Sequence, residues 1–138
     1  MAWGRNESTV IDTAKIDKTL NQTITDQVIT TAIWENQVYD SNNLVDIATN
    51  NERITIRRAG FYLIMLQTRR LPTISIATDI RDYIILDGLS VLNRFSSSKL
   101  SIDNVLHHIQ SFAYHNFVVG QFVTHQTYHN RGGNWDLG

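Results

Sequence analysis

Histidines and acidic residues are the side chains whose types and spacing could support chemistry here, because the sequence contains no cysteine. A zinc ion needs several ligand atoms within bonding distance. His125 and His129 would share one face of a strand, but four residues of strand separate them by about 13 Å. His107 and His108 would point to opposite faces. The spacing therefore predicts no metal site within one chain, and only a three-fold axis that gathers one histidine per subunit could build one.

The acidic residues show no catalytic spacing either. Asp79, Asp82 and Asp87 are close in sequence, but carboxylate catalysis requires a cleft and a shifted pKa, and turns use such residues routinely. Residues 40–46 faintly resemble a calcium loop, yet they lack its glycine and its terminal glutamate. Residues 88–92 do not form a nucleophile elbow. We therefore predict a protein that is not an enzyme and that has no cofactor and no bound metal.

Length and composition favour one all-β domain. The chain has 138 residues, 12 basic and 13 acidic residues, and a net charge of −1. A nucleic-acid surface would show a basic excess, so nucleic acid is not an expected partner. No apolar run has the length of a signal peptide core or a membrane span, so we expect neither secretion nor a membrane partner. The abundance of isoleucine, valine and threonine favours strands.

The stretch from Arg53 to Arg70 organises the predicted fold. Residues 53–57 alternate polar and apolar, which is typical of a strand with one buried face. Ala59 and Gly60 interrupt this alternation. Residues 61–66 are all apolar or aromatic, so both faces of this strand are predicted to be covered. One sandwich has one core, and the second apolar face therefore predicts association with further copies of the chain.

The rest of the sequence predicts a sandwich preceded by an arm. Residues 1–26 are polar with isolated apolar residues, and we expect an extended arm there, although a short helix is an alternative. Residues 27–138 form the predicted domain. Its further strands are expected at 28–34, 83–86, 89–95, 104–116 (with a helix as the alternative), 117–128 and 135–137. The arm residues expected to contact a partner are Trp3, Val10, Ile11, Ile16 and Leu20.

Four motifs carry a resemblance to a known family. They are Ile54-Thr55-Ile56 with Ala59-Gly60, Tyr62 and Ile64; Val38-Tyr39-Asp40; Arg81 to Gly88; and Val119 to Val123. In order and spacing they resemble the C1q/TNF-like jelly roll, including the versions in phage virion proteins, over roughly residues 28–131. The resemblance implies an antiparallel jelly-roll sandwich that forms homotrimers. It also implies that one of two faces lines the three-fold axis, formed by Tyr62, Ile64 and Leu66, or by His108, Phe112 and Tyr114.

The expected function follows from this resemblance and from the absence of a reactive constellation. We expect a structural protein of the virion, made in the host cytoplasm, whose short chain is complete. Its expected role is a homotrimeric capsid decoration (cement) protein that binds and stabilises a phage capsid through the major capsid protein or another virion protein. The alternative is the receptor-binding head of a phage tail fibre.

Overall fold

The described part of the chain consists of strands joined by turns and loops. The computed structural model describes residues 11–70, 79–97, 107–130 and 132–137, and within them it contains twelve strands. None of these residues belongs to a helix that is long and apolar enough to cross a membrane. The strands are β1 (Ala14–Asp17), β2 (Gln22–Ile24), β3 (Thr30–Thr31), β4 (Asn36–Asp40), β5 (Val45–Asp46), β6 (Asn50–Thr55), β7 (Gly60–Arg70), β8 (Ile80–Leu86), β9 (Ser90–Ser97), β10 (His107–Phe117), β11 (Phe122–His129) and β12 (Trp135–Leu137).

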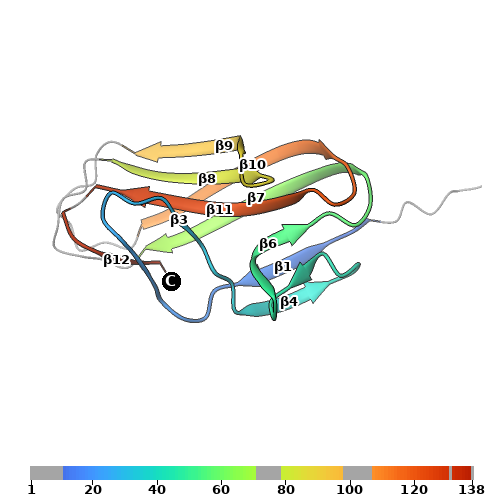
Figure 1. Cartoon of the computed structure of the whole chain (residues 1–138), viewed down its shortest axis with the longest axis horizontal. Coiled ribbons are helices and arrows are strands. Elements are labelled where there is room, and N and C mark those ends of the chain that lie inside the picture. The colour runs from blue at the N-terminus through green and yellow to red at the C-terminus, as the bar shows by residue number, and fades with distance from the viewer. Residues whose placement is uncertain (1–10, 71–78, 98–106, 131, 138) are drawn as a thin grey trace, which may run out of the picture.

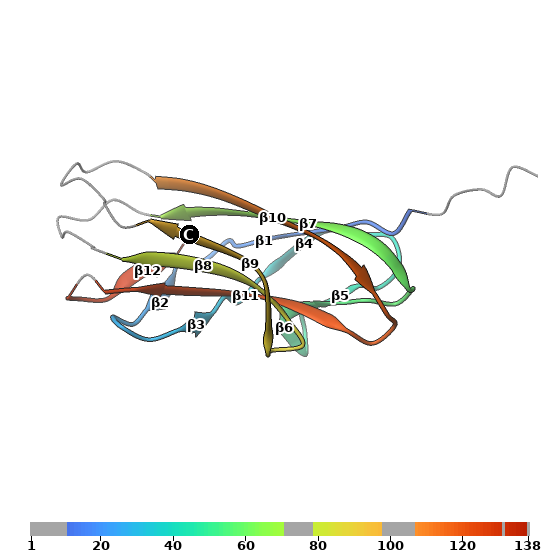
Figure 2. The same ribbon diagram turned by 90° about the horizontal axis from the view of Figure 1, so that it is seen from above.

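The strands form two antiparallel sheets that face each other (Figures 1 and 2). A four-stranded sheet has the order β10-β7-β12-β2. A six-stranded sheet has the order β5-β6-β11-β8-β9, with β3 also paired to β11. A separate ribbon consists of β1 and β4. The prediction of an all-β fold with antiparallel sheets is confirmed, and the arrangement is compatible with a sandwich.

Two turns lie at aspartate and glycine residues, between β8 and β9 and between β10 and β11. Asp87 and Gly88 both adopt positive φ, at 51° and 71°, and join β8 to β9 as a hairpin. Gly120, with φ at 91°, turns the chain from β10 into β11. A side chain other than glycine resists such angles. The Asp87 carboxylate accepts hydrogen bonds from the Phe122 amide at 2.9 Å and the Gln121 side chain at 3.2 Å, and it thereby joins the two turns.

Residues 104–116 were expected to form a strand or a helix. The described residues from His107 onward form strand β10. It pairs with β7 along the whole length of both strands, from His107 opposite Arg70 to Phe117 opposite Gly60. The main core lies between this pair and the six-stranded sheet. Its buried members are Ile56, Leu66, Ile84, Leu86, Ala113, Phe117 and Val123, with Trp34, Tyr62, Ile64 and Leu92 packed against them.

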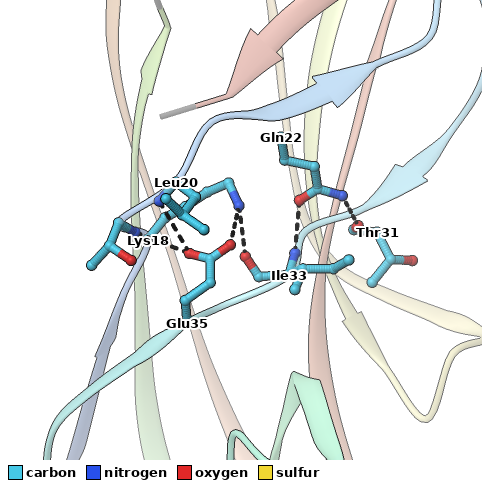
Figure 3. Close-up of polar contacts among 7 residues, drawn as sticks. Lys18, Leu20, Gln22, Thr31, Ile33 and Glu35 are labelled. Atoms are coloured by element: carbon cyan, nitrogen blue, oxygen red, sulfur yellow. Dashed lines mark hydrogen bonds and ion pairs between the residues drawn. The ribbon is translucent and has the colours of Figure 1, made fainter.

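Residues 11–26 are integrated into the sandwich, which differs from the extended arm expected over residues 1–26. Strand β1 pairs with β4, and β2 pairs with β12. Between them, Lys18 Nζ donates to Glu35 at 2.8 Å and to the Ile33 carbonyl at 2.9 Å (Figure 3). The partners of β1 and β2 lie far along the sequence, so local patterns do not reveal them.

Residues 28–34 form less strand than predicted. Thr30 and Thr31 pair with β11, and the Ala32 amide still donates to the His125 carbonyl of β11 at 2.9 Å. Beyond them the backbone changes partners: the Ile33 amide donates to the Gln22 side chain at 2.8 Å, and the Trp34 amide donates to the Asn51 carbonyl at 2.8 Å. An apolar run predicts burial, but it does not fix a single ladder partner.

Candidate functional site

The outer face of β7 and β10 is an exposed apolar strip. We use the name "outer strip" for Phe61, Leu63, Met65, Phe112 and Tyr114. Between 58% and 69% of each of these residues is exposed. Leu63 lies opposite Tyr114, and Met65 lies opposite Phe112. The rings of Phe61 and Tyr114 stack at 5.2 Å between centroids. Large apolar side chains gathered on one sheet face are typical of a contact surface.

Polar residues bound the outer strip along the strand direction. Asn116 lies opposite Phe61 at one end, and Gln110 lies opposite Gln67 at the other. The outer strip itself contains no charged side chain. A dry apolar centre with a polar margin is the usual anatomy of a protein–protein contact.

Three residues predicted for the trimer interface, as one of two alternative faces, face the core of the chain. Leu66 is buried, and Tyr62 and Ile64 pack against the core cluster. The Tyr62 hydroxyl lies within hydrogen-bond distance of Asp12 Oδ2 (3.1 Å) and the Arg58 carbonyl (2.9 Å). Burial and the Asp12 carboxylate raise the pKa of Tyr62. Successive strand residues alternate in direction, and an all-apolar run does not reveal which set points inward.

The other predicted face does point to solvent. Phe112 and Tyr114 are 65% and 68% exposed. His108 belongs to β10, but its side chain lies outside the described part of the structure. Phe61, Leu63 and Met65 are also exposed, and they were not among the residues predicted for an interface. Their signal was available in the alternation, because Leu63 and Met65 flank Ile64 and must point the other way.

Aromatic residues on the outside of the six-stranded sheet lie under arginines. The Arg53 guanidinium lies 4.8 Å from the centre of the Phe122 ring, and that of Arg81 lies 5.1 Å from the centre of Tyr128. Arg81 is itself paired with Asp79. These cation–π contacts cover apolar rings with charge. No described residue makes such a contact with Phe61 or Tyr114.

A cleft of about 650 Å³ opens beside β7, and Gln110 of β10 is among the residues that line it. Residues 14–19, which include β1, form one wall, and residues 63–69 of β7 form the other. Leu137 closes one end. The floor consists of core side chains of both sheets and of the segment before β4, including Trp34, Ile84 and His125.

A buried polar pair lies next to the cleft floor. His125 Nε2 and Asp82 Oδ1 are 3.0 Å apart, and the two side chains are only 4% and 0% exposed. The Thr68 hydroxyl points to the same carboxylate at 3.5 Å. His125 Nδ1 is buried and has no hydrogen-bond partner among the described residues. Asp82 was expected to solvate a turn, but it is an inward-facing residue of β8.

The remaining predicted residues divide into three groups. Ile11 and Leu20 are exposed, as a partner contact requires, and Ile16 lines the cleft. Trp3 and Val10 lie outside the described residues. His125 and His129 both point into the sandwich, where His129 Nε2 lies 3.0 Å from the Ile24 carbonyl oxygen. Within the described ranges, no group of three or more histidine, aspartate or glutamate side chains is placed to hold a metal ion.

Known proteins give no further assignment. Neither the models of known protein families nor the curated proteins contain a match to this sequence.

Proposed function

We propose that this protein is a non-enzymatic structural protein that associates with itself through the outer strip. The observation that carries this proposal is the row of five large apolar side chains, each more than half exposed, on the outer face of β7 and β10. A monomer would leave this surface in water. Closed rotational symmetry buries such a surface without creating an open-ended fibre. A homotrimer is the assembly that we propose.

The strand order supports a jelly roll as the finer description of the fold. The strands from β6 onward pass repeatedly between the sheets: β6, β8, β9 and β11 lie in one, while β7, β10 and β12 lie in the other, and β8 and β9 follow each other within one sheet as a hairpin. Two Greek keys folded onto each other produce this kind of alternation. Together with the four sequence motifs, it supports the resemblance to C1q/TNF-like virion proteins.

The biological role that we propose is a decoration or cement protein on a phage capsid, with the major capsid protein as its partner. Two observations support an additional contact surface outside the outer strip. Ile11 and Leu20 are 71% and 67% exposed, and both lie in the N-terminal segment that runs along the margin of the sandwich. The virion assignment rests on the sequence resemblance, and the trimer rests on the outer strip.

The experiment that tests self-association places a charge in the outer strip. Tyr114→Asp is expected to convert trimers to monomers while the circular dichroism spectrum stays unchanged, because an uncompensated charge in a dry contact is strongly unfavourable. Leu89→Asp is the matched control, because Leu89 is 89% exposed at the β8–β9 turn, away from the outer strip. Light scattering after size exclusion gives the mass of each variant. If Tyr114→Asp stays trimeric, or if the wild type is a monomer at all concentrations, the outer strip is not the interface.

Particle reconstruction tests the role in the virion. A decoration protein is expected in many copies over the capsid surface, and its removal should lower the temperature at which capsids open. A tail-fibre head would instead occur in few copies at the tail tip, which would replace the cement role by the alternative.

A further inference from the structure

We propose that the cleft beside β7 is an acceptor site for an extended strand of a second protein chain. The occupant would complete the four-stranded sheet by pairing with β7 on one side and with β1 on the other. This inference rests on the open edge of β7 and not on the exposure of the outer strip, although Leu63 and Met65 belong to the outer strip and also line the cleft.

The backbone of β7 provides the first argument. One edge of this strand pairs with β10 over its full length. On the other edge, Arg70 pairs with Leu137, and residues 63–69 have no backbone partner among the described residues. In a strand, alternate residues direct their amide and carbonyl groups to the same edge. A row of such groups beside an apolar cleft is a template for a further strand.

The opposite wall is also an open edge. Strand β1 pairs with β4 on one side, and no described residue pairs with its other side, which borders the cleft. Strand β12 lies in line with the cleft. Its Leu137 pairs with Gln22 and with Arg70, so it already occupies the place between the N-terminal segment and β7. A strand that continued the register of β12 would run antiparallel to β7, opposite Arg69 first and Leu63 last.

The lining residues define what this strand must carry. Ile64 and Leu66 point inward, so the residues opposite them face the core and should be apolar. The residue opposite Thr68 faces the buried Asp82–His125 pair. A hydroxyl there could donate to the unpartnered His125 Nδ1. Opposite Arg69, an acidic residue is favoured by charge. The partner is therefore an extended segment with the pattern acidic, hydroxyl, polar, apolar, polar, apolar, polar.

A synthetic peptide tests the proposal directly. The probe is fluorescein-labelled Glu-Ser-Thr-Val-Thr-Val-Thr, and binding to the full chain is measured by fluorescence anisotropy. The matched control has the same side chains with alternate amides N-methylated, which removes ladder hydrogen bonds. We expect saturable binding of the probe and at least about tenfold weaker binding of the control, because several backbone hydrogen bonds are lost.

Hydrogen exchange shows where the peptide binds. Bound probe is expected to slow exchange at every second amide between Leu63 and Arg69, by at least about tenfold, while the amides paired with β10 are already protected. A chain carrying Ser-Thr-Val-Thr-Val-Thr after Gly138 should fill the cleft itself and lose binding of the probe. Binding should persist in Tyr114→Asp, which separates this site from the outer strip.

Three results would overturn the inference. The first is that the probe shows no saturable binding to the full chain. This result counts against the inference even if the chain extended after Gly138 is more stable than the wild type. The second is equal binding of the N-methylated control. The third is protection confined to amides outside β7 and β1.

Discussion

The two outer faces of this sandwich treat aromatic residues differently. On the six-stranded sheet, Phe122 lies under Arg53 and Tyr128 lies under Arg81. On the four-stranded sheet, Phe61 and Tyr114 stack on each other and stay more than 60% exposed. Arginine side chains therefore cover aromatic rings on the outer face of the six-stranded sheet, but no described arginine covers the rings over β7 and β10. The difference teaches that arginine cover distinguishes the aromatic rings of the two faces, whereas exposed apolar side chains also occur elsewhere, including Val38 on β4 and Val91 on β9.

The largest expected effect separates the two sides of β7. Leu66→Ala should lower the free energy of unfolding by about 2–5 kcal/mol, because it leaves a cavity in the core. Met65→Ala, one residue away, should change it by less than about 0.5 kcal/mol in dilute monomer, because Met65 is 69% exposed. Urea unfolding at low protein concentration measures both. Similar losses would mean that Met65 is as buried as Leu66, and the comparison of faces would fail.

A smaller effect concerns the arginine cover on the other face. Arg53→Ala should lower the free energy of unfolding by about 0.5–1 kcal/mol, because the cation–π contact with Phe122 is lost. Arg53→Lys is the control, since it keeps a cation near the ring and should retain part of the stability. Thermal unfolding of the three proteins side by side gives the ranking. An alanine variant as stable as the wild type would show that the cover over Phe122 contributes nothing.

The smallest expected effect concerns Lys18, at the margin of the four-stranded sheet. Lys18 is 5% exposed in its side chain and pairs with Glu35. Burial acts to raise the pKa of Glu35, but hydrogen bonds from Lys18 and from the Thr19 and Leu20 amides, together with the charge of Lys18, lower it overall. A lowered folded-state pKa stabilises the fold above the unfolded-state pKa, and this stability is lost as pH falls through the folded value.

Glu35→Gln should therefore cost less than about 1 kcal/mol at pH 7. It should also flatten the loss of stability between about pH 5 and pH 3, where a free glutamate titrates. Denaturant unfolding across this range measures both quantities, and Asp136→Asn serves as a comparison at another partly exposed carboxylate. If the free energy of unfolding of Glu35→Gln and of the wild type depended on pH in the same way, Glu35 would not contribute to the pH dependence of stability.

Local sequence signals predicted the turns and most strands well. Asp87-Gly88 adopts backbone angles that few other residues accept, so the β8–β9 hairpin followed from residue type. The strand expected over residues 117–128 is instead divided at Gly120, whose φ is 91°. The side of β7 that faces the core could not be predicted in this way, because residues 61–66 are apolar on both sides. Tertiary contacts decide it, in particular the hydrogen bond from Tyr62 to Asp12, fifty positions earlier.

The cleft and the buried Asp82–His125 pair could not be predicted from the sequence either, because both depend on long-range strand pairing. Asp82 and His125 are 43 positions apart, and each resembles an ordinary polar strand residue until β8 and β11 are paired. The cleft needs the placement of β1 next to β7, and the pairing of β1 with β4 gives no local sign of it. Long-range pairing thus created the features that sequence patterns could not show.

The pairing of β2 with β12 has a consequence for synthesis. Ile24 pairs with Trp135, and Gln22 pairs with Leu137, so a strand near the start of the chain depends on one more than a hundred positions later. Ribosomes extend a chain at roughly 5–20 residues per second. For roughly 5–20 seconds the nascent protein must hold β2 without its partner strand β12. We therefore expect its yield in cells to respond to chaperone supply more than its final stability would suggest.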